Sequence, residues 1–151
     1  MTADPPATAP SRGKDTTRST ADREKAIRLL VVDDEPSICE ALSALFALHG
    51  LDVVTVLTAA EALNALATSV FDVLLIDLRL RDRRGDVLFR EAIGANPALR
   101  ERTLFMTGDI TAEAERIIAE TNCPFLHKPF DITLAVQSIA ALLGITYNPE
   151  A

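Results

Sequence analysis

The stretch RLLVVDDEPS, residues 28–37, joins an apolar run to a cluster of acids. Its opening leucine and valine residues are typical of a buried strand. Asp33, Asp34 and Glu35 follow directly, and Pro36 stands where a helix can begin. Acids this close repel one another, and burying them unpaired is unfavourable. We therefore expect a cation to lie among them, at the end of a strand.

From residue 27 onward, segments with a strand pattern alternate with segments with a helix pattern. The predicted strands are apolar and rich in β-branched residues; they cover residues 27–32, 51–57, 71–78, 102–108 and a short stretch within 123–130. The predicted helices repeat apolar residues at helical spacing; they cover residues 36–49, 59–68, 85–94, 112–120 and 132–143. Thr58, Thr111 and Asp131 stand where they can cap the starts of helices.

Five strand–helix units in a row predict an α/β fold with a parallel sheet that is covered on both faces. Right-handed crossovers and the size of the chain favour a flavodoxin-like, doubly wound (βα)5 arrangement with strand order 2-1-3-4-5. In such folds the ligand crevice lies at the carboxyl ends of the strands, at the switch point between the first and third strands.

The composition of the 151-residue chain limits its class. Residues 1–26 are rich in Thr, Ser, Ala and Pro, so we expect a disordered leader, then a domain over residues 27–144 and a short tail over 145–151. No apolar run is long enough for a membrane span and no signal peptide opens the chain, which favours a cytoplasmic protein without a membrane partner. The formal net charge of -7 argues against a nucleic-acid surface. Cys39 and Cys123 lack metal or redox spacing, so we expect buried thiols.

Chemically active residues fall at the ends of the predicted strands. The first strand ends at Asp33 and Asp34, the third at Asp77, the fourth at Thr107 and the fifth at Lys128. Because parallel strands share one carboxyl edge, three carboxylates, a hydroxyl and an amine should meet there. A single acid after a strand is more often a solvated strand end or a helix cap, but the whole set predicts a site.

The carboxylates of this set indicate a hard cation. Carboxylates without His or Cys ligands nearby favour Mg2+. We expect Asp34 and Asp77 to bind it directly, and Asp33 to bind it directly or through water. Mg2+ is therefore the cation that we expect among the acids of residues 33–35.

The remaining residue types suit phosphoryl transfer. A carboxylate such as Asp77 can attack phosphorus and form an acyl phosphate. Lys128 would neutralise phosphate oxygens and Thr107 would donate a hydrogen bond. Gly108 would keep the backbone open to a bulky phosphoryl group.

Four short motifs and one glycine form a specific combination. The motifs are VVDDEP (31–36), LLIDLRL (74–80), FMTGD (105–109) and HKPF (127–130), and Gly85 stands eight residues after Asp77. On these residues the chain resembles the receiver domain of two-component response regulators, in a stand-alone, single-domain form. The resemblance covers residues 27–143, which is nearly all of the foldable chain.

The resemblance implies a role for each residue of the site. These roles are phosphoacceptor for Asp77, acidic pair for Asp33 and Asp34, switch hydroxyl for Thr107, phosphate-binding lysine for Lys128, cis peptide before Pro129, and aromatic switch for Phe125. For Phe125, simple core packing is an equally good interpretation.

The resemblance also implies a mechanism. A phosphohistidine on a sensor histidine kinase or histidine phosphotransfer protein would donate to Asp77. Thr107 would then move inward and Phe125 would rotate, which remodels the face formed by the fourth helix, fifth strand and fifth helix. That face would contact a downstream protein or a second copy of the chain. Only GITYNPEA follows Leu143, so we expect output by protein contact or phosphate relay.

The segment after Asp77 departs from the family. Receivers often carry a proline four residues after the phosphoacceptor, and here that residue is Arg81. The loop RLRDRRGD, residues 79–86, holds four arginines in an otherwise acidic domain. It is either a solvated loop or a docking patch for an anionic donor.

Arg79 and Asp109 stand two residues after Asp77 and Thr107, at positions that flank the path of the hydrolytic water in receivers. Their opposite charges could pair across the site and shield an acyl phosphate. We expect autodephosphorylation to be slower than in Arg79→Asn.

Two other functions stay open from the sequence. One is a degenerate receiver that only binds partners, which the complete set of site residues argues against. The other is a Mg2+-dependent aspartyl phosphohydrolase of the haloacid-dehalogenase kind. Those enzymes place an acid two residues after the nucleophile, where this chain has Arg79. We therefore expect no enzyme that turns over an external substrate.

Overall fold

The structure is a computed structural model that describes residues 26–147. The predicted leader lies almost wholly outside this range, as does the end of the predicted tail. Within the described range, no helix is long and apolar enough to cross a membrane.

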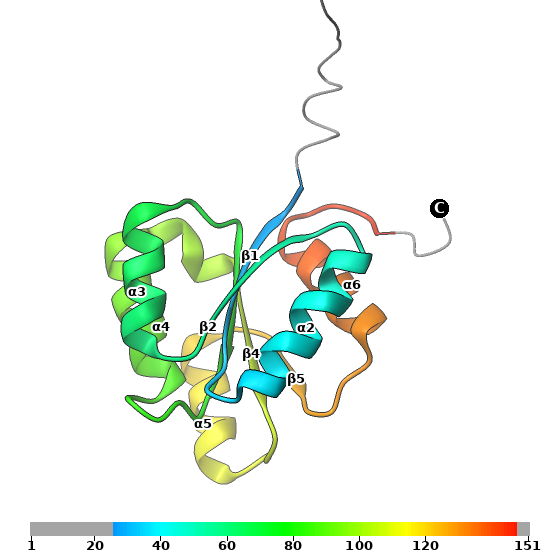
Figure 1. Ribbon diagram of the computed structural model, residues 1–151. Coiled ribbons are helices and arrows are strands. Elements are labelled where there is room, and N and C mark those ends of the chain that lie inside the picture. Colours follow the sequence, from blue (N-terminus) through cyan, green and yellow to red (C-terminus); the bar gives the residue numbers. More distant parts are fainter. Residues whose placement is uncertain (1–25, 148–151) are drawn as a thin grey trace, which may run out of the picture.

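Strands and helices alternate along the described chain (Figure 1). The strands are β1 (Arg28–Val32), β2 (Asp52–Val56), β3 (Val73–Asp77), β4 (Thr103–Thr107) and β5 (Phe125–His127). The helices are α2 (Pro36–Leu48), α3 (Ala59–Thr68), α4 (Gly85–Ala95), α5 (Ala112–Thr121) and α6 (Ile132–Leu142), with a 3-10 helix, η1 (Pro97–Glu101), before β4. All strand pairs are parallel, in the order β2-β1-β3-β4-β5. The predicted flavodoxin-like fold is confirmed.

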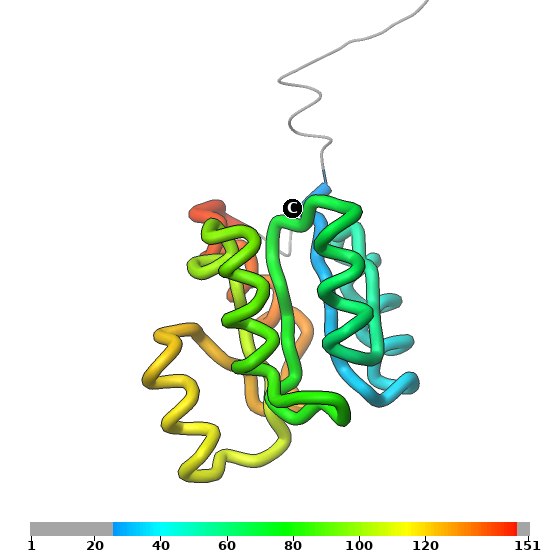
Figure 2. The backbone as a smooth tube through the Cα atoms, turned by 90° about the vertical axis from the view of Figure 1, so that its left-hand side faces the viewer, coloured from blue at the N-terminus to red at the C-terminus, as the bar shows by residue number. Residues whose placement is uncertain are grey.

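Helices cover both faces of the sheet, as the views in Figure 1 and Figure 2 show. Residues of α2 and α6 share one apolar core with the sheet. Residues of α3, α4 and α5 share a second core on the opposite face. Such two-sided cover is what parallel sheets require, because their strands have no solvent-facing side.

The central strands alternate between the two cores. In β1, Leu29 and Val31 belong to the core under α2 and α6, whereas Leu30 and Val32 belong to the other. Every residue of β3 is buried. The nearly unbroken apolar runs of the sequence therefore follow from burial on both faces.

Side chains cap the helices much as the sequence predicts. Thr111 and Asp131 accept hydrogen bonds from backbone N–H groups in the first turns of α5 and α6. Thr58 accepts from the Glu61 N–H at 3.0 Å. The Glu61 carboxylate accepts from the Leu57 N–H instead of the Thr58 N–H, so the capping box is displaced by one residue.

Candidate functional site

The strand ends bring the predicted site residues together at one edge of the sheet. Asp33 follows β1, Asp77 ends β3, Thr107 ends β4 and Lys128 follows β5. The register aligns these ends, because Asp77 is paired with Met106 in β4. Residues up to 95 positions apart in the sequence therefore become neighbours.

Lys128 joins two of the three carboxylates. Its Nζ lies 2.6 Å from Asp33 Oδ2 and 2.7 Å from Asp77 Oδ2. Asp33 is fully buried and Asp77 nearly so. Burial raises the pKa of Asp77 even though Lys128 and the Arg79 N–H oppose the shift. Burial acts to lower the pKa of Lys128, but its hydrogen bonds to the two carboxylates outweigh burial and raise it.

The third carboxylate, Asp34, lies on the solvent side of this pair. Oxygens of Asp33, Asp34 and Asp77 lie within 4.8 Å of one another. Three carboxylates beside the ammonium of Lys128 and the guanidinium of Arg81 leave the cluster with an excess of negative charge. The oxygen-only ligands and this excess fit a divalent hard cation such as Mg2+.

The backbone around Asp77 is fixed from two sides. The Arg79 N–H donates to Asp77 Oδ1 at 2.8 Å. The first residue of α4, Gly85, lies directly against the strand end: a Cβ atom there would stand 2.5 Å from the Asp77 backbone oxygen. A side chain at position 85 would therefore displace the Asp77 backbone.

Thr107 and Gly108 line the β4 side of the site. The Thr107 hydroxyl donates to the Asp109 backbone oxygen at 2.8 Å and accepts from the Asp109 N–H at 3.2 Å. It is thus engaged with its own loop and not with Asp77. The space around Gly108 is open, since a Cβ there would meet no atom within 4 Å.

Comparison with known proteins identifies this arrangement. Residues 29–140 match the family model described as "Response regulator receiver domain". The chain belongs to the response regulator receiver domain family. This family is the signalling module of two-component systems and is not a class of enzymes that turn over an external substrate.

Curated relatives of this receiver domain include bacterial transcriptional regulators. The chain is 30% identical over 126 residues to the transcriptional regulatory protein ZraR of Escherichia coli, which covers 83% of this chain and 28% of ZraR. It is 36% identical over 109 residues to the DNA-binding transcriptional regulator NtrC of Escherichia coli, covering 72% of this chain and 23% of NtrC. The chain thus spans about a quarter of the length of these relatives.

Solved structures share the fold of the receiver domain. A CheY-like receiver domain protein from Methanospirillum hungatei superposes with a TM-score of 0.73 at 23% identity, covering 80% of this chain and 95% of that one. The non-phosphorylated HemR receiver domain from Leptospira biflexa gives 0.68 at 25% identity, covering 81% and 98%.

Several further residues of this receiver domain lie where the sequence places them. The Lys128–Pro129 peptide is cis. Arg79 Nη1 lies 3.8 Å from Asp109 Oδ2, with both side chains about two-thirds exposed. Phe125 is 40% exposed, and its role as an aromatic switch stays a prediction.

The four arginines of the β3–α4 loop all have acidic partners. Besides the Arg79 pair, Arg81 approaches Asp34, Arg83 pairs with Glu91, and Arg84 pairs with Asp86 and Glu113. The loop therefore carries less unpaired positive charge than its sequence indicates.

Among the described residues, Asp86 is the most deeply buried acid outside the cluster of Asp33, Asp34 and Asp77, with an exposed fraction of 1%. Arg84 binds it through two nitrogens at 3.0 Å and Arg90 binds it at 2.9 Å. The two arginines lower its pKa despite its burial. Sequence reasoning missed Asp86 because an acid in the first turn of a helix reads as an ordinary surface residue.

The two cysteines are buried free thiols, as expected. Cys39 Sγ donates to the backbone oxygen of Asp33 at 3.2 Å. Burial, and secondarily the Asp33 charge, raises the Cys39 pKa to about 11, and burial raises that of Cys123. Neither thiol is therefore a reactive thiolate at neutral pH.

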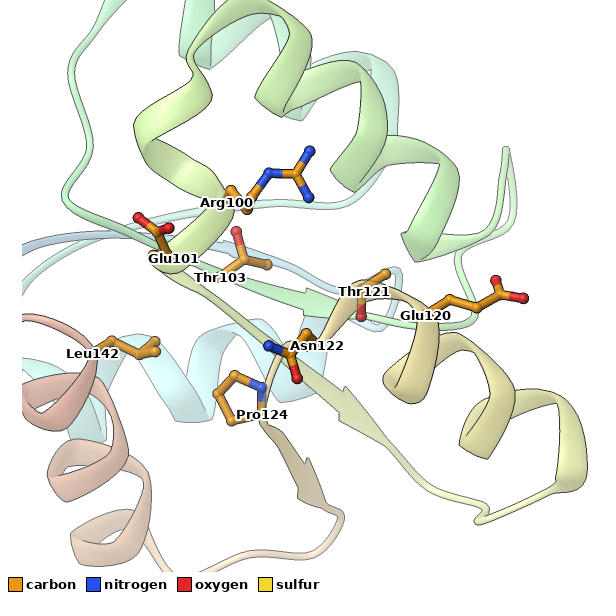
Figure 3. Close-up of a pocket in the computed structure, with 8 residues that line it drawn as sticks. All are labelled: Arg100, Glu101, Thr103, Glu120, Thr121, Asn122, Pro124 and Leu142. Atoms are coloured by element: carbon orange, nitrogen blue, oxygen red, sulfur yellow. The ribbon is translucent and has the colours of Figure 1, made fainter.

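A pocket of about 340 Å³ lies near the amino ends of β4 and β5, away from the carboxyl ends that hold the candidate site (Figure 3). It is formed around the start of β4 and the end of α5. Its buried hydroxyls, on Thr103 and Thr121, donate to the backbone oxygens of Leu99 and Ile117 at 2.7 and 2.8 Å. These groups are satisfied within the protein, so the pocket offers no buried donor to a ligand.

Proposed function

We propose that this receiver domain is a phosphorylation-dependent switch of a two-component phosphorelay, with Asp77 as its phosphoacceptor. The observation that supports this most strongly is the ammonium of Lys128, held between Asp33 and Asp77 beside a third carboxylate. A nucleophile, a cation for phosphate oxygens and a set of metal ligands then share one edge of the sheet. Acyl-phosphate chemistry needs this combination.

In the proposed transfer, an oxygen of Asp77 attacks the phosphorus of a phosphohistidine on a sensor histidine kinase or phosphotransfer protein. A P–O bond forms as the P–N bond breaks, and the histidine nitrogen leaves with the electron pair. Lys128 stays beside the carboxylate and binds phosphoryl oxygens. Gly108 leaves open space above the site, and Thr107 exchanges its bond to Asp109 for a bond to the phosphoryl group.

Asp33, Asp34 and Asp77 are the residues proposed to hold Mg2+. When bound, the ion would offset negative charge on the phosphoryl oxygens. Asp33 lies deepest and also accepts a hydrogen bond from the Glu35 N–H at 2.9 Å, which fixes its orientation for a ligand role.

The proposed output is contact with a downstream protein or relay of the phosphoryl group, from a cytoplasmic location. Phe125 is partly exposed, and its exposure would change as Thr107 moves. The affected face comprises α5, β5 and α6. Slow autodephosphorylation is proposed to follow from the Arg79–Asp109 pair. Absence of nucleic-acid contact remains an expectation from charge alone.

The test is intact-mass spectrometry after incubation with acetyl phosphate, in Mg2+ and in excess chelator. We expect a gain of one phosphoryl group that depends on Mg2+ and is lost in Asp77→Asn. Asp52→Asn is the matched control, since Asp52 is an exposed acid at the start of β2. Labelling of Asp77→Asn equal to that of the control would refute the assignment of Asp77.

No gain with acetyl phosphate would favour a binding-only receiver or one loaded only by its kinase. A purified phosphohistidine donor separates these two, because only the second accepts phosphate from it. Return of phosphate to a histidine protein would then indicate a relay, and tighter binding of a target after phosphorylation would indicate a switch.

A further inference from the structure

Arg81, in the loop between β3 and α4, lies against the outermost acid of the site. Its Nε is 3.6 Å from Asp34 Oδ2. Lys128 pairs with Asp33 and Asp77 but not with Asp34. Within residues 26–147, Arg81 is thus the one cation paired with Asp34.

The loop holds the backbone of Arg81 in place on both sides. Leu80 before it is buried in the core under α3, α4 and α5. Asp82 after it accepts hydrogen bonds from the Ala59 and Ala60 N–H groups at the start of α3, at 3.0 and 3.1 Å. The Arg81 side chain is 80% exposed, yet it starts from a fixed point. Pairing with Asp34 therefore costs the conformational entropy of one side chain, and not that of the loop backbone as well.

Two basic side chains of this chain thus partner all three proposed metal ligands. Lys128 is partly buried and binds the inner pair, where it would also serve the proposed phosphoryl transfer. Arg81 stands on the solvent side, the side from which a hydrated cation must approach Asp34. A divalent ion that takes Asp34 as a ligand must displace the guanidinium or share the carboxylate with it.

We propose that Arg81 is a built-in counter-ion that competes with Mg2+ for Asp34 and so sets the metal affinity of the site. The inference rests on the proposed function, because it takes the three acids as a metal site. Many receivers have a proline at this position. The arginine found here would help to set the Mg2+ concentration at which the domain can accept a phosphoryl group. Removing the Arg81 charge should tighten Mg2+ binding.

The same loop supplies a matched control. Arg83 lies two residues further on, and its guanidinium pairs with Glu91 of α4 instead of a metal ligand. Arg81→Gln and Arg83→Gln change the net charge of the protein by the same amount and keep a polar side chain of similar reach. General attraction of Mg2+ to a more acidic protein is therefore nearly equal in both, and only the first variant removes the positive charge that is paired with Asp34.

The experiment is calorimetric titration of Mg2+ into the unphosphorylated full chain at low ionic strength, for the parent and both variants. We expect Arg81→Gln to bind Mg2+ about two- to fivefold more tightly than Arg83→Gln, the range that an exposed ion pair can supply. The difference should shrink at high KCl, because salt screens exposed pairs. Amide shifts of Asp34 and Asp77 in NMR spectra give a second readout of the same affinity.

Equal affinities of the two variants, with Mg2+ still bound by the parent, would overturn the inference and leave the proposed function intact. Absence of Mg2+ binding by all three proteins would instead remove the metal from the proposed function, and the inference with it. The mass-spectrometric test of Asp77 is independent of both outcomes.

Discussion

Helices α5 and α6 follow the two strands that carry Thr107 and Lys128, yet they are held to the molecule in different ways. Helix α6 has no charged residue and buries four apolar ones, namely Ala135, Val136, Ile139 and Ala140. Helix α5 buries only two apolar residues, Ala114 and Ile117, and has four charged ones. Helix α6 is fixed mainly by packing against the sheet, whereas α5 has fewer buried contacts and adds exposed ion pairs to α4.

The ion pairs of α5 lead to one buried acid in α4. Arg84 and Arg90 both bind Asp86, and they also reach Glu113 and Glu120 of α5 at 3.1 and 3.6 Å. Beneath them, a cavity of about 220 Å³ lies between α5 and the β3–α4 loop, with Thr107 in its wall. The comparison teaches that the helix downstream of Thr107 is the less tightly packed of the two. Its position should therefore respond to salt and acid when that of α6 does not.

The largest expected effect comes from the packed helix. Ile139 is fully buried, and Ile139→Ala should lower the free energy of unfolding by about 2–5 kcal/mol because it leaves a cavity. Leu134→Ala on the same helix is the control, since its side chain is 52% exposed. Urea unfolding followed by circular dichroism measures both. Similar losses in the two variants would show that α6 is not fixed by its buried face.

An intermediate effect is expected from the acid that anchors the ion pairs. Asp86→Ala leaves two arginines without their shared partner and should lower the free energy of unfolding by about 1–3 kcal/mol. Hydrogen exchange should accelerate in α5 more than in α6. Equal acceleration in both helices would mean that Asp86 supports the whole domain and not α5 in particular.

This loss should depend on pH in a defined direction. The folded protein lowers the pKa of Asp86, so its stabilising contribution is present above the ordinary aspartate pKa of about 3.9 and is lost as pH falls through the lower folded value. The difference between parent and Asp86→Ala should therefore be constant near neutral pH and shrink in strong acid. A difference that persists in strong acid would point to packing as the role of Asp86.

The smallest effect is expected from the α5 side of the network. Glu113→Gln combined with Glu120→Gln removes exposed pairs and should change the free energy of unfolding by no more than about 1 kcal/mol. Exchange of α5 amides should still rise by up to about fivefold. Glu115→Gln is the control, because Glu115 makes no ion pair within the described residues. High salt should mimic the double variant in the parent.

Short-range sequence signals predicted most of the fold and the part of the site around Asp33, Asp77 and Lys128. Pro36, Thr111 and Asp131 mark helix starts because they act within one turn, and the shared carboxyl edge of parallel strands placed Asp77 beside Lys128. The 3-10 helix η1 was missed. The Asn96 side chain begins it by accepting from the Ala98 N–H at 3.2 Å, and a run of five residues is too short to show a period.

The outer part of the site could not be predicted, for a physical reason. The partners of Arg81, Asp82 and Asp86 belong to other elements, so they depend on how loops and helices lie in space. The sequence predicted the partner of Arg79, which is Asp109, but not the carboxylates that Arg81, Arg83 and Arg84 reach. It indicated four similar positive charges, whereas the structure gives each a different neighbour.

The close approach of Gly85 to Asp77 has a mechanical consequence. With no room for even a methyl group between them, the end of β3 and the first turn of α4 cannot move toward each other. Strain introduced at the Asp77 carboxylate cannot relax in that direction. On the other side, the cavity of about 220 Å³ between the β3–α4 loop and α5 leaves room for movement, so a single missing side chain gives the strand end a preferred direction of displacement.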